Sequence, residues 1–232
     1  MNPERLYFGY GSNLDAEDWA AWCSTNAADP TSMVELGPAW LLDHSLRFHY
    51  RSKGRGGGAA DVVEDSRGTA VPGALFSLSE EGWKWMNQKE GHPTVYRQTP
   101  VRVITLEGKV MEAITYVVQP KHQRSELVVP TEAYAGLIRK GLRERKLPIK
   151  HLNLAIQNFD SPSTIEHVFV YGTLMKGKER WPRMRSWATE GPANGHVQGR
   201  LYHLGHYPGI RLDEKGLVHG ELYRCRDING AL

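Results

Sequence analysis

A short aromatic strand that runs directly into a turn of small polar residues occurs twice in this chain, and it constrains the fold more than any other feature. The first copy occupies residues 7–14 (YFGYGSNL), and the second occupies residues 169–174 (FVYGTL). Glycine lets backbone N–H groups approach a ligand closely, and a small hydroxyl or amide beside it supplies an oriented side-chain partner. We therefore expect two related units, each with a ligand cradle at this junction.

Length and composition are those of a soluble globular protein. The 232 residues suffice for one large or two modest domains, and a net charge of +3 is too small to favour nucleic-acid binding. The basic cluster Arg139–Lys146 is interpreted as a solvated helix face. No run approaches the roughly 20 apolar residues of a membrane span, and residues 1–5 lack the core of a signal peptide. With Cys23 and Cys225 interpreted as reduced thiols, we expect a cytoplasmic protein that binds neither nucleic acid nor membrane.

Hydrophobic periodicity and turn residues predict an α+β first unit, in which strands are closed by helices. The expected strands are Leu6–Tyr10, Leu42–Tyr50, Ala59–Val63, Val71–Leu78, Tyr96–Thr105 and Val110–Val118. The expected helices are Ala16–Trp22, begun near Asp15, one from an N-cap at Ser77 or Ser79 to Gly91, and two pieces around residues 134–142 and 149–156. The segment Ser52–Gly58 is interpreted as a flexible turn, with close backbone approach to a ligand as the alternative.

Glu90 breaks two local rules on its predicted helix. Trp83, Met86 and Glu90 are spaced by three and then four residues, so they share one face, and the carboxylate lies on the apolar stripe. Glu90 also lies in the last turn, where the helix dipole disfavours a negative charge by roughly 0.3–1 kcal/mol. Burial and dipole would both raise its pKa, which makes Glu90 a candidate functional residue. The alternative is a Glu90 that turns to solvent or pairs with Lys89 or Arg97.

Three separated landmarks of the first unit carry a resemblance to a known family. They are the loop of residues 7–14, the strand ending in residues 73–76 (GALF), and Lys89-Glu90-Gly91 with Tyr96 after it. With these, the first unit resembles the γ-glutamylcyclotransferase family nearly end to end, and segment Thr131–Ile156 resembles that family's C-terminal helix pair. Residues 169–177 are more similar to the γ-glutamylamine cyclotransferase and AIG2-like branch.

The resemblance implies a small mixed β-barrel flanked by helices for each unit, with a ligand pocket at the loop. It implies Glu90 as general acid/base, with substrate contacts at Tyr7, Phe8, Gly9, Tyr10, Gly11, Ser12, Asn13 and Tyr96. The implied reaction is the cyclisation of a γ-glutamyl amide (of an amino acid, peptide or amine) to 5-oxoproline with release of the amine. The implied enzyme is of the carbon–nitrogen lyase or acyltransferase type, and it needs neither a cofactor nor a metal.

The residues fit this chemistry. The substrate's own α-amine is the nucleophile, so a carboxylate with a raised pKa suffices to take a proton and return it to the leaving amine. Backbone N–H groups near Gly11 and Ser12 are candidate oxyanion donors. Other signals are weaker: Ser12 as a nucleophile lacks a histidine placed by motif, His203-x-x-His206 lacks a third metal ligand, and a strand-end Asp61 is usually solvated.

The second unit departs from the family pattern. The polar segment Asp160–Thr164 is the expected linker, so the predicted domains are 1–160 and 165–232. Glu90 lies 17 residues after Gly73 (90 − 73), whereas 17 residues after the matching Gly220 is position 237 (220 + 17), beyond Leu232. Asp227 matches the start of the first unit's helix and would face the wrong way. We expect a truncated copy that lacks the catalytic acid and exposes a sheet edge.

Two other function classes stay open at this stage. The same cradle suits a non-catalytic binding module for a γ-glutamyl-like small molecule. The tandem arrangement suits an assembly protein that uses the second unit as its interface. The expected partners are accordingly a small-molecule γ-glutamyl substrate and another copy of the same fold. That copy is either in a second chain of a homo-oligomer or in the other unit of this chain.

Overall fold

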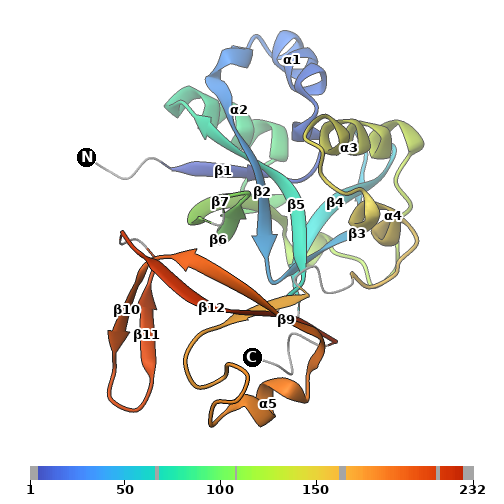
Figure 1. Ribbon diagram of the computed structural model, residues 1–232. Coiled ribbons are helices and arrows are strands. Elements are labelled where there is room, and N and C mark those ends of the chain that lie inside the picture. The colour runs from blue at the N-terminus through green and yellow to red at the C-terminus, as the bar shows by residue number, and fades with distance from the viewer. Residues whose placement is uncertain (1–4, 66–67, 108, 162–165, 213–214, 227–232) are drawn as a thin grey trace. The chain divides into compact units, whose positions relative to one another are not determined.

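Five strands of the first unit close into a barrel in the order β1–β5–β2–β6–β7 (Figure 1). They are β1 (Leu6–Gly9), β2 (Met33–Leu42), β5 (Ala70–Leu78), β6 (Tyr96–Thr105) and β7 (Val110–Val118). β1 pairs antiparallel with β5 and closes the barrel by a parallel contact with β7, where Tyr7 faces Ile114. The predicted α+β class is confirmed, and the barrel implied by the resemblance is present in this unit.

The chain divides into two units, residues 1–162 and 163–232. The computed structural model describes residues 5–65, 68–107, 109–161, 166–212 and 215–226. Asp227, residues 162–164 of the expected linker and residues 1–4 therefore lie outside the described residues. Within the described part, no helix is long and apolar enough to span a membrane. Cys23 and Cys225 are both buried, free thiols.

The helices of the first unit begin at the caps that the sequence supplies. Asp15 accepts the Asp18 N–H at the start of α1 (Ala16–Thr25), and Ser79 accepts the Gly82 N–H at the start of α2 (Glu80–Glu90). α2 ends at Gly91, which adopts the left-handed conformation with φ of 62°. The remaining helices are α3 (Glu132–Glu144) and α4 (Lys150–Ile156), with 3-10 turns η1 (Ser12–Leu14), η2 (Pro30–Ser32) and η3 (Pro120–His122).

A separate two-stranded sheet lies beside α4 and consists of β3 (His44–Ser52) and β4 (Gly57–Glu64). The predicted strand Leu42–Tyr50 begins too early, because Leu42 ends β2 and Asp43 turns the chain with φ of 57°. β2 itself was not predicted. It contains Gly37 and Pro38, which usually break a strand, but a bulge between Glu35 and Gly37 accommodates them.

The glycine triplet at residues 56–58 packs against the chain's own backbone. A Cβ atom on Gly58 would lie 1.8 Å from the Val128 carbonyl oxygen, and the Gly58 N–H donates to the Val129 carbonyl at 3.0 Å. The interpretation as a flexible turn is therefore wrong for Gly57 and Gly58, which begin β4. The close approach is real, but its partner is the segment that leads into α3.

The basic cluster on α3 fixes that helix to the opening loop. Lys140 pairs with Asp15 at 3.0 Å, and Arg145 pairs with Glu35 at 2.6 Å. Arg145 also donates to the Leu14 carbonyl at 2.7 Å, and its side chain is 10% exposed. The interpretation as a solvated face is therefore wrong for Arg145, which links α3 to the turn after β1.

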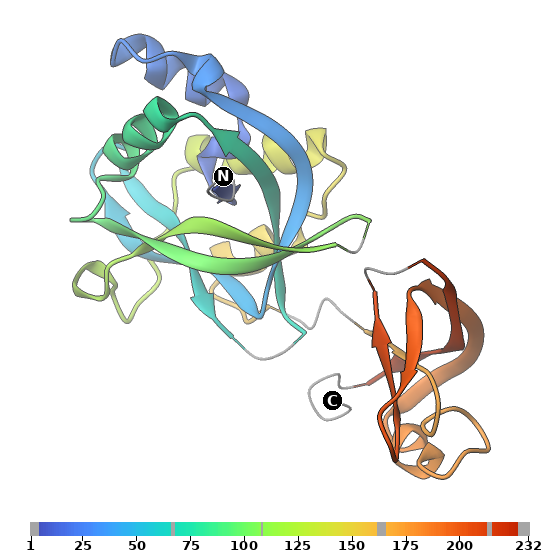
Figure 2. The same ribbon diagram turned by 90° about the vertical axis from the view of Figure 1, so that its left-hand side faces the viewer.

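The second unit is an open sheet with the strand order β8–β12–β9, accompanied by a hairpin of β10 and β11. The elements are β8 (His167–Val170), α5 (Trp181–Arg185), β9 (Ala188–Gln198), β10 (Arg200–His203), β11 (Pro208–Arg211) and β12 (Leu217–Cys225). Figure 2 shows the curved strands of this sheet in orange and red. A closed barrel is thus present in the first unit but not among the described residues of the second.

The two units share one strand pairing in the same register. β1 pairs with β5 so that Gly9 faces Ala74, and β8 pairs with β12 so that Val170 faces Glu221. Gly73 and Gly220 occupy equivalent positions, because a Cβ on either would lie 2.3 Å from the carbonyl oxygen of the paired strand. The internal repeat predicted from the two junctions therefore extends to backbone geometry.

Candidate active site

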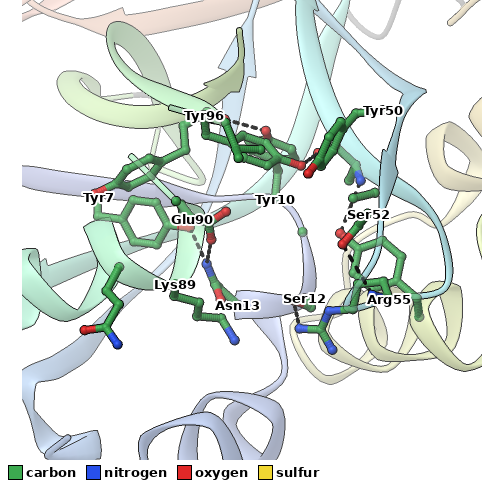
Figure 3. A pocket seen from close by; sticks show the side chains of 18 residues that line it. Tyr7, Tyr10, Ser12, Asn13, Tyr50, Ser52, Arg55, Lys89, Glu90 and Tyr96 are labelled. Carbon is green, nitrogen blue, oxygen red and sulfur yellow. Dashed lines mark hydrogen bonds between the residues drawn. The ribbon is translucent and has the colours of Figure 1, made fainter. Parts of the chain in front are cut away.

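The turn after β1 is held so that its polar residues face a cavity. The Leu14 N–H donates to the Gly11 carbonyl at 3.1 Å, which closes the 3-10 turn. Arg145 fixes the Leu14 carbonyl from the side of α3. Ser12 and Asn13 are buried polar residues, 7% and 4% exposed. The sequence motif thus forms a rigid polar wall opposite the C-terminal end of α2 (Figure 3).

Glu90 meets this wall through Asn13. Asn13 Nδ2 donates to Glu90 Oε1 at 2.8 Å, to Tyr7 Oη at 2.8 Å and to Met86 Sδ at 3.3 Å. Met86 is fully buried, so Met86 and Glu90 share the inward face of α2. The alternatives for Glu90 are not adopted, since no described ion pair joins it to Lys89 or Arg97, and Lys89 pairs with Asp18.

Burial controls the charge state of Glu90. It raises the pKa of the carboxyl above its ordinary value, and this effect outweighs the lowering by Lys89, by the Asn13 hydrogen bond and by Arg55. The predicted direction of the shift is therefore confirmed. A carboxyl with a raised pKa exchanges protons nearer to neutral pH than an exposed glutamate does, which suits general acid/base chemistry.

Tyrosine side chains form the rest of the inner wall. Tyr10 donates to the Tyr116 carbonyl at 2.5 Å, and Tyr96 donates to the Ala60 carbonyl at 2.9 Å. Tyr134 accepts the Ala60 N–H at 3.2 Å, and burial raises its pKa to about 12. These phenols are neutral at physiological pH, so they supply oriented dipoles and apolar ring faces without adding charge.

Two cations near Glu90, namely Arg55 and Lys89, both contact the carboxylate of Asp18. Both Oδ atoms of Asp18 accept from Arg55, at 2.7 Å each, and Arg55 Nη2 also donates to Ser12 Oγ at 2.9 Å. Lys89 Nζ lies 3.2 Å from Asp18 Oδ2. Burial raises the pKa of Asp18, but hydrogen bonds and charges from Arg55 and Lys89 more than offset it, so the pKa is lowered. Asp18 is therefore an anion at neutral pH.

The cavity enclosed by these groups measures about 220 Å³. One water occupies roughly 30 Å³ in the liquid, so the cavity accommodates a small organic molecule. Among the predicted substrate-binding residues, its lining includes Tyr7, Tyr10, Gly11, Ser12, Asn13 and Tyr96, together with Glu90. Phe8 and Gly9 are not in the lining. Phe8 points to the opposite face of the strand from Tyr7 and is fully buried in the core. Gly9 has no side chain, and the rings of Phe76 and Tyr7 occupy the space beside its Cα atom.

The sequence interpretation missed several lining residues: Tyr50, Ser52, Arg55, Lys89, Tyr116 and Tyr134. Two of them carried a usable signal. Lys89 directly precedes Glu90, and Arg55 is the one cation within the glycine-rich stretch of residues 54–58. The tyrosines come from β3, β7 and α3, and only the fold brings them to the loop.

Of the weaker sequence candidates, Asp61, His203 and His206 lie outside the cavity. Asp61 is fully buried instead of solvated, and it accepts the Val62 and Val118 N–H groups at 2.9 Å. It supports the sheet behind the cavity lining. No histidine occurs among the described residues that line the cavity, so Ser12 has no base there. No cluster of three or more metal-binding side chains occurs in the part of the chain that the structure describes, His203 and His206 included.

The corresponding loop of the second unit lies beside a cavity without a carboxylate. No Asp or Glu is found among its described lining residues, which include Tyr171, Thr173 and Leu174. The nearby buried acid, Glu221, accepts the Lys176 N–H at 2.7 Å and the Tyr223 hydroxyl at 2.6 Å. It thus fixes the loop backbone from β12.

Comparisons with known proteins identify the family of this chain. The family model described as gamma-glutamyl cyclotransferase, AIG2-like, matches residues 7–136 and 168–232, so both units contribute to the match. A search of curated proteins gave no match.

Solved structures share the fold. A structure named gamma-glutamyl cyclotransferase is 24% identical with a TM-score of 0.55, over 68% of this chain and 89% of that one. The human uncharacterized protein loc79017 is 24% identical with a TM-score of 0.55, over 70% and 92%. YkqA from Bacillus subtilis is 22% identical with a TM-score of 0.55, over 70% and 57%. These structures establish likeness of fold, and the family model, which covers most of both units, establishes that the chain belongs to the gamma-glutamyl cyclotransferase, AIG2-like family.

Proposed function

We propose that this protein is a γ-glutamylcyclotransferase whose first unit, residues 1–160, converts a γ-glutamyl amide to 5-oxoproline and a free amine. The observation that carries the proposal is the hydrogen bond from Asn13 to Glu90 inside a cavity of substrate size. It joins the loop motif and the acid, which are far apart in the sequence, in one site. Family membership supports the same reaction class.

Glu90 acts as both base and acid in this proposal. The ionised carboxylate takes a proton from the substrate's α-ammonium group, and the freed amine attacks the γ-carbonyl carbon to close the five-membered ring. The Glu90 carboxylic acid then returns its proton to the amide nitrogen, and the bond from the carbonyl carbon to that nitrogen breaks. The regenerated carboxylate takes the second proton from the ring nitrogen, which leaves the neutral lactam, and passes it to the released amine. Proton transfer by a positioned side chain contributes typically 10²–10⁴-fold in rate.

The loop holds the substrate in the bent conformation that cyclisation needs. Bringing amine and carbonyl together in advance supplies up to roughly 7–11 kcal/mol in well-oriented intramolecular reactions. Backbone N–H groups of the turn around Gly11 and Ser12 are our candidates for stabilising the oxyanion. The neutral tyrosines of the wall exclude water from the reacting atoms.

The second unit supplies no complete site in this proposal. Its loop cavity has no carboxylate among the described lining residues, and Glu221 is engaged with the Lys176 backbone. We assign residues 165–232 a structural or assembly role. Removing residues 165–232 should then change the oligomeric state or the stability of the protein and retain 5-oxoproline formation.

The test is a 5-oxoproline assay on a panel of γ-glutamyl amino acids, peptides and amines. The wild-type protein should turn over at least one of them, and Glu90→Gln should slow that turnover by about 10²–10⁴-fold. Undiminished turnover by Glu90→Gln would refute the assigned role of Glu90. Calorimetric binding of the same compounds without turnover by the wild type would instead identify a non-catalytic binding module.

A further inference from the structure

A second cavity adjoins the one that contains Glu90. It measures about 430 Å³, and Ser52, Arg55 and Lys89 line both cavities. The other side of the second cavity is formed by α1, through Asp18, Ala21, Trp22, Thr25 and Asn26, and by Gly54. Arg55 and Lys89 of the shared lining, together with Asp18 of the second cavity, form a charged wall where the two cavities adjoin. Figure 3 shows Lys89 near Glu90 and Arg55 near Ser12.

This wall carries an excess of positive charge. Counted apart from the catalytic Glu90, Arg55 and Lys89 are two cations against one anion, Asp18, which leaves a net charge of +1 (two minus one). The Lys89 side chain is 6% exposed, and among the described residues its ammonium has one acceptor, Asp18, for three N–H donors. An incompletely paired, buried ammonium at the edge of two cavities favours an anionic ligand.

The cations are held in position by aromatic rings. The Lys89 ammonium lies 5.9 Å from the Trp19 ring centre and 5.6 Å from that of Trp22. The Arg55 guanidinium lies 5.2 Å from the Tyr134 ring centre. Cation–π contacts of this kind fix the cations before a ligand arrives, so little ordering is needed on binding.

We propose that the wall formed by Arg55, Lys89 and Asp18 is the leaving-group subsite, and that it selects γ-glutamyl amino acids or peptides, whose tails carry a carboxylate, over γ-glutamyl amines. This inference rests on the proposed function, because it takes the glutamyl head to be held at Glu90. Arg and Lys bind carboxylates through charge-assisted hydrogen bonds, which are about twice as strong as neutral ones. Asp18 is the counter-ion that keeps both cations paired in the absence of a ligand.

A matched substrate pair isolates the tail carboxylate. γ-Glutamylalanine and γ-glutamylethylamine have the same head and the same two-carbon tail, and only the alanine compound carries the carboxylate. For the wild-type protein, we expect kcat/KM for γ-glutamylalanine to exceed that for γ-glutamylethylamine by about 10- to 100-fold, the usual scale of a hydrogen bond between charged groups.

Two variants should move this ratio in opposite directions. Lys89→Met keeps a side chain of similar length against the tryptophans but removes the charge, so the ratio should fall by about tenfold or more. Asp18→Asn keeps the shape of the side chain but removes the competing anion, so the ratio should rise. Both variants also perturb Glu90, but that effect acts on both substrates and cancels in the ratio. A general loss of folding would likewise lower both rates together.

Each outcome separates this inference from the proposed function. Equal kcat/KM values for the two compounds in the wild type would overturn the subsite while cyclotransferase activity stands. If Lys89→Met lowers both rates but leaves the ratio of the two kcat/KM values unchanged, the cations bind the glutamyl head. That result would overturn the subsite as well. If the wild type forms no 5-oxoproline from these two compounds or from any other compound of the panel, the proposed function fails. Dissociation constants of the two compounds measured on Glu90→Gln by calorimetry still decide the subsite, because equal values overturn it.

Discussion

Replacing Glu90 with Gln should stabilise the protein while removing its activity. Gln has nearly the same shape, and its side-chain oxygen still accepts the hydrogen bond from Asn13 Nδ2. What the change removes is a negative charge buried at the C-terminal end of α2, where the helix dipole also disfavours it by roughly 0.3–1 kcal/mol. Since function and stability place opposite demands on this position, the two effects of one substitution have opposite signs.

The pH dependence of this stabilisation follows from the raised pKa of Glu90. Burial raises that pKa above its ordinary value of 4.5, so the folded chain binds this proton more tightly than the unfolded chain does. The contribution of Glu90 to the wild-type free energy of unfolding therefore falls as the pH rises from 4.5 to the raised pKa, and it stays low above that. Gln does not titrate. The stability difference between Glu90→Gln and wild type should thus grow across this window, by about 1.4 kcal/mol for each pH unit that separates the folded and unfolded pKa values.

Calorimetric unfolding of both proteins between pH 4 and pH 8 measures this difference. At pH 8 we expect Glu90→Gln to unfold with a free energy larger by about 1 kcal/mol or more, which raises Tm by about 2–4 °C for a chain of this size. Glu81→Gln is the matched control, because Glu81 is exposed in the first turn of the same helix. There the dipole favours the carboxylate, so the control should lose about 0.3–1 kcal/mol. A difference for Glu90→Gln that is independent of pH, or that shrinks as pH rises, refutes the reasoning.

Three further predictions concern the loop, the glycine triplet and the second unit. Asn13→Ala removes a hydrogen bond that lowers the pKa of Glu90, so the acidic limb of the kcat/KM profile should move to higher pH; an unmoved limb contradicts this. Gly58→Ala should cost about 1–3 kcal/mol or more in thermal unfolding because of its close backbone contact. Gly54→Ala, with open space around it, is the control and should cost less than half as much. Glu221→Ala should expose residues 171–180 to limited proteolysis, since the Lys176 N–H loses the acceptor that fixes the loop; unchanged cleavage rates would argue against that role.

Local sequence signals were sufficient for most elements of the first unit. The hairpin Tyr96–Thr105 and Val110–Val118 was predicted with the bounds that the structure has, because alternation is regular on both sides of a turn. Helix α2 was also predictable, because Ser79 and Gly91 mark its two ends. β2 was missed because Gly37 and Pro38 suppress the strand signal, and only pairing with β5 and β6 stabilises it.

In the candidate site too, some residues were predictable from the local sequence and others were not. Helical spacing alone placed Glu90 on the buried face beside Met86, and the glycine-rich turn pointed to Ser12 and Asn13. The cationic wall was not predictable from local pattern. Arg55 and Lys89 meet at Asp18, which is separated from them by 37 and 71 residues in the sequence. Such convergence depends on the tertiary fold, which single-sequence patterns do not specify.

Pattern matching between the two units predicted part of the internal repeat and missed part of it. Matching the loop motifs correctly related Gly73 to Gly220, and the structure places both against the carbonyl oxygen of the paired strand. The expected unfinished sheet agrees with the open sheet in the described part of the second unit. The match did not predict that Glu221, which takes the place of Ala74 in the shared register, binds the loop backbone. One substitution in an equivalent strand thus gives the second loop a different anchor.

The most direct test of the central claim compares 5-oxoproline formation by wild type and Glu90→Gln on γ-glutamylalanine, at a pH near 8 where both proteins are folded. We predict that wild type releases 5-oxoproline and alanine in equal amounts. Glu90→Gln should be slower by about 10²–10⁴-fold, the usual contribution of a general acid/base, despite a higher Tm. Equal rates for the two proteins would contradict the assignment of Glu90 as the catalytic carboxyl group.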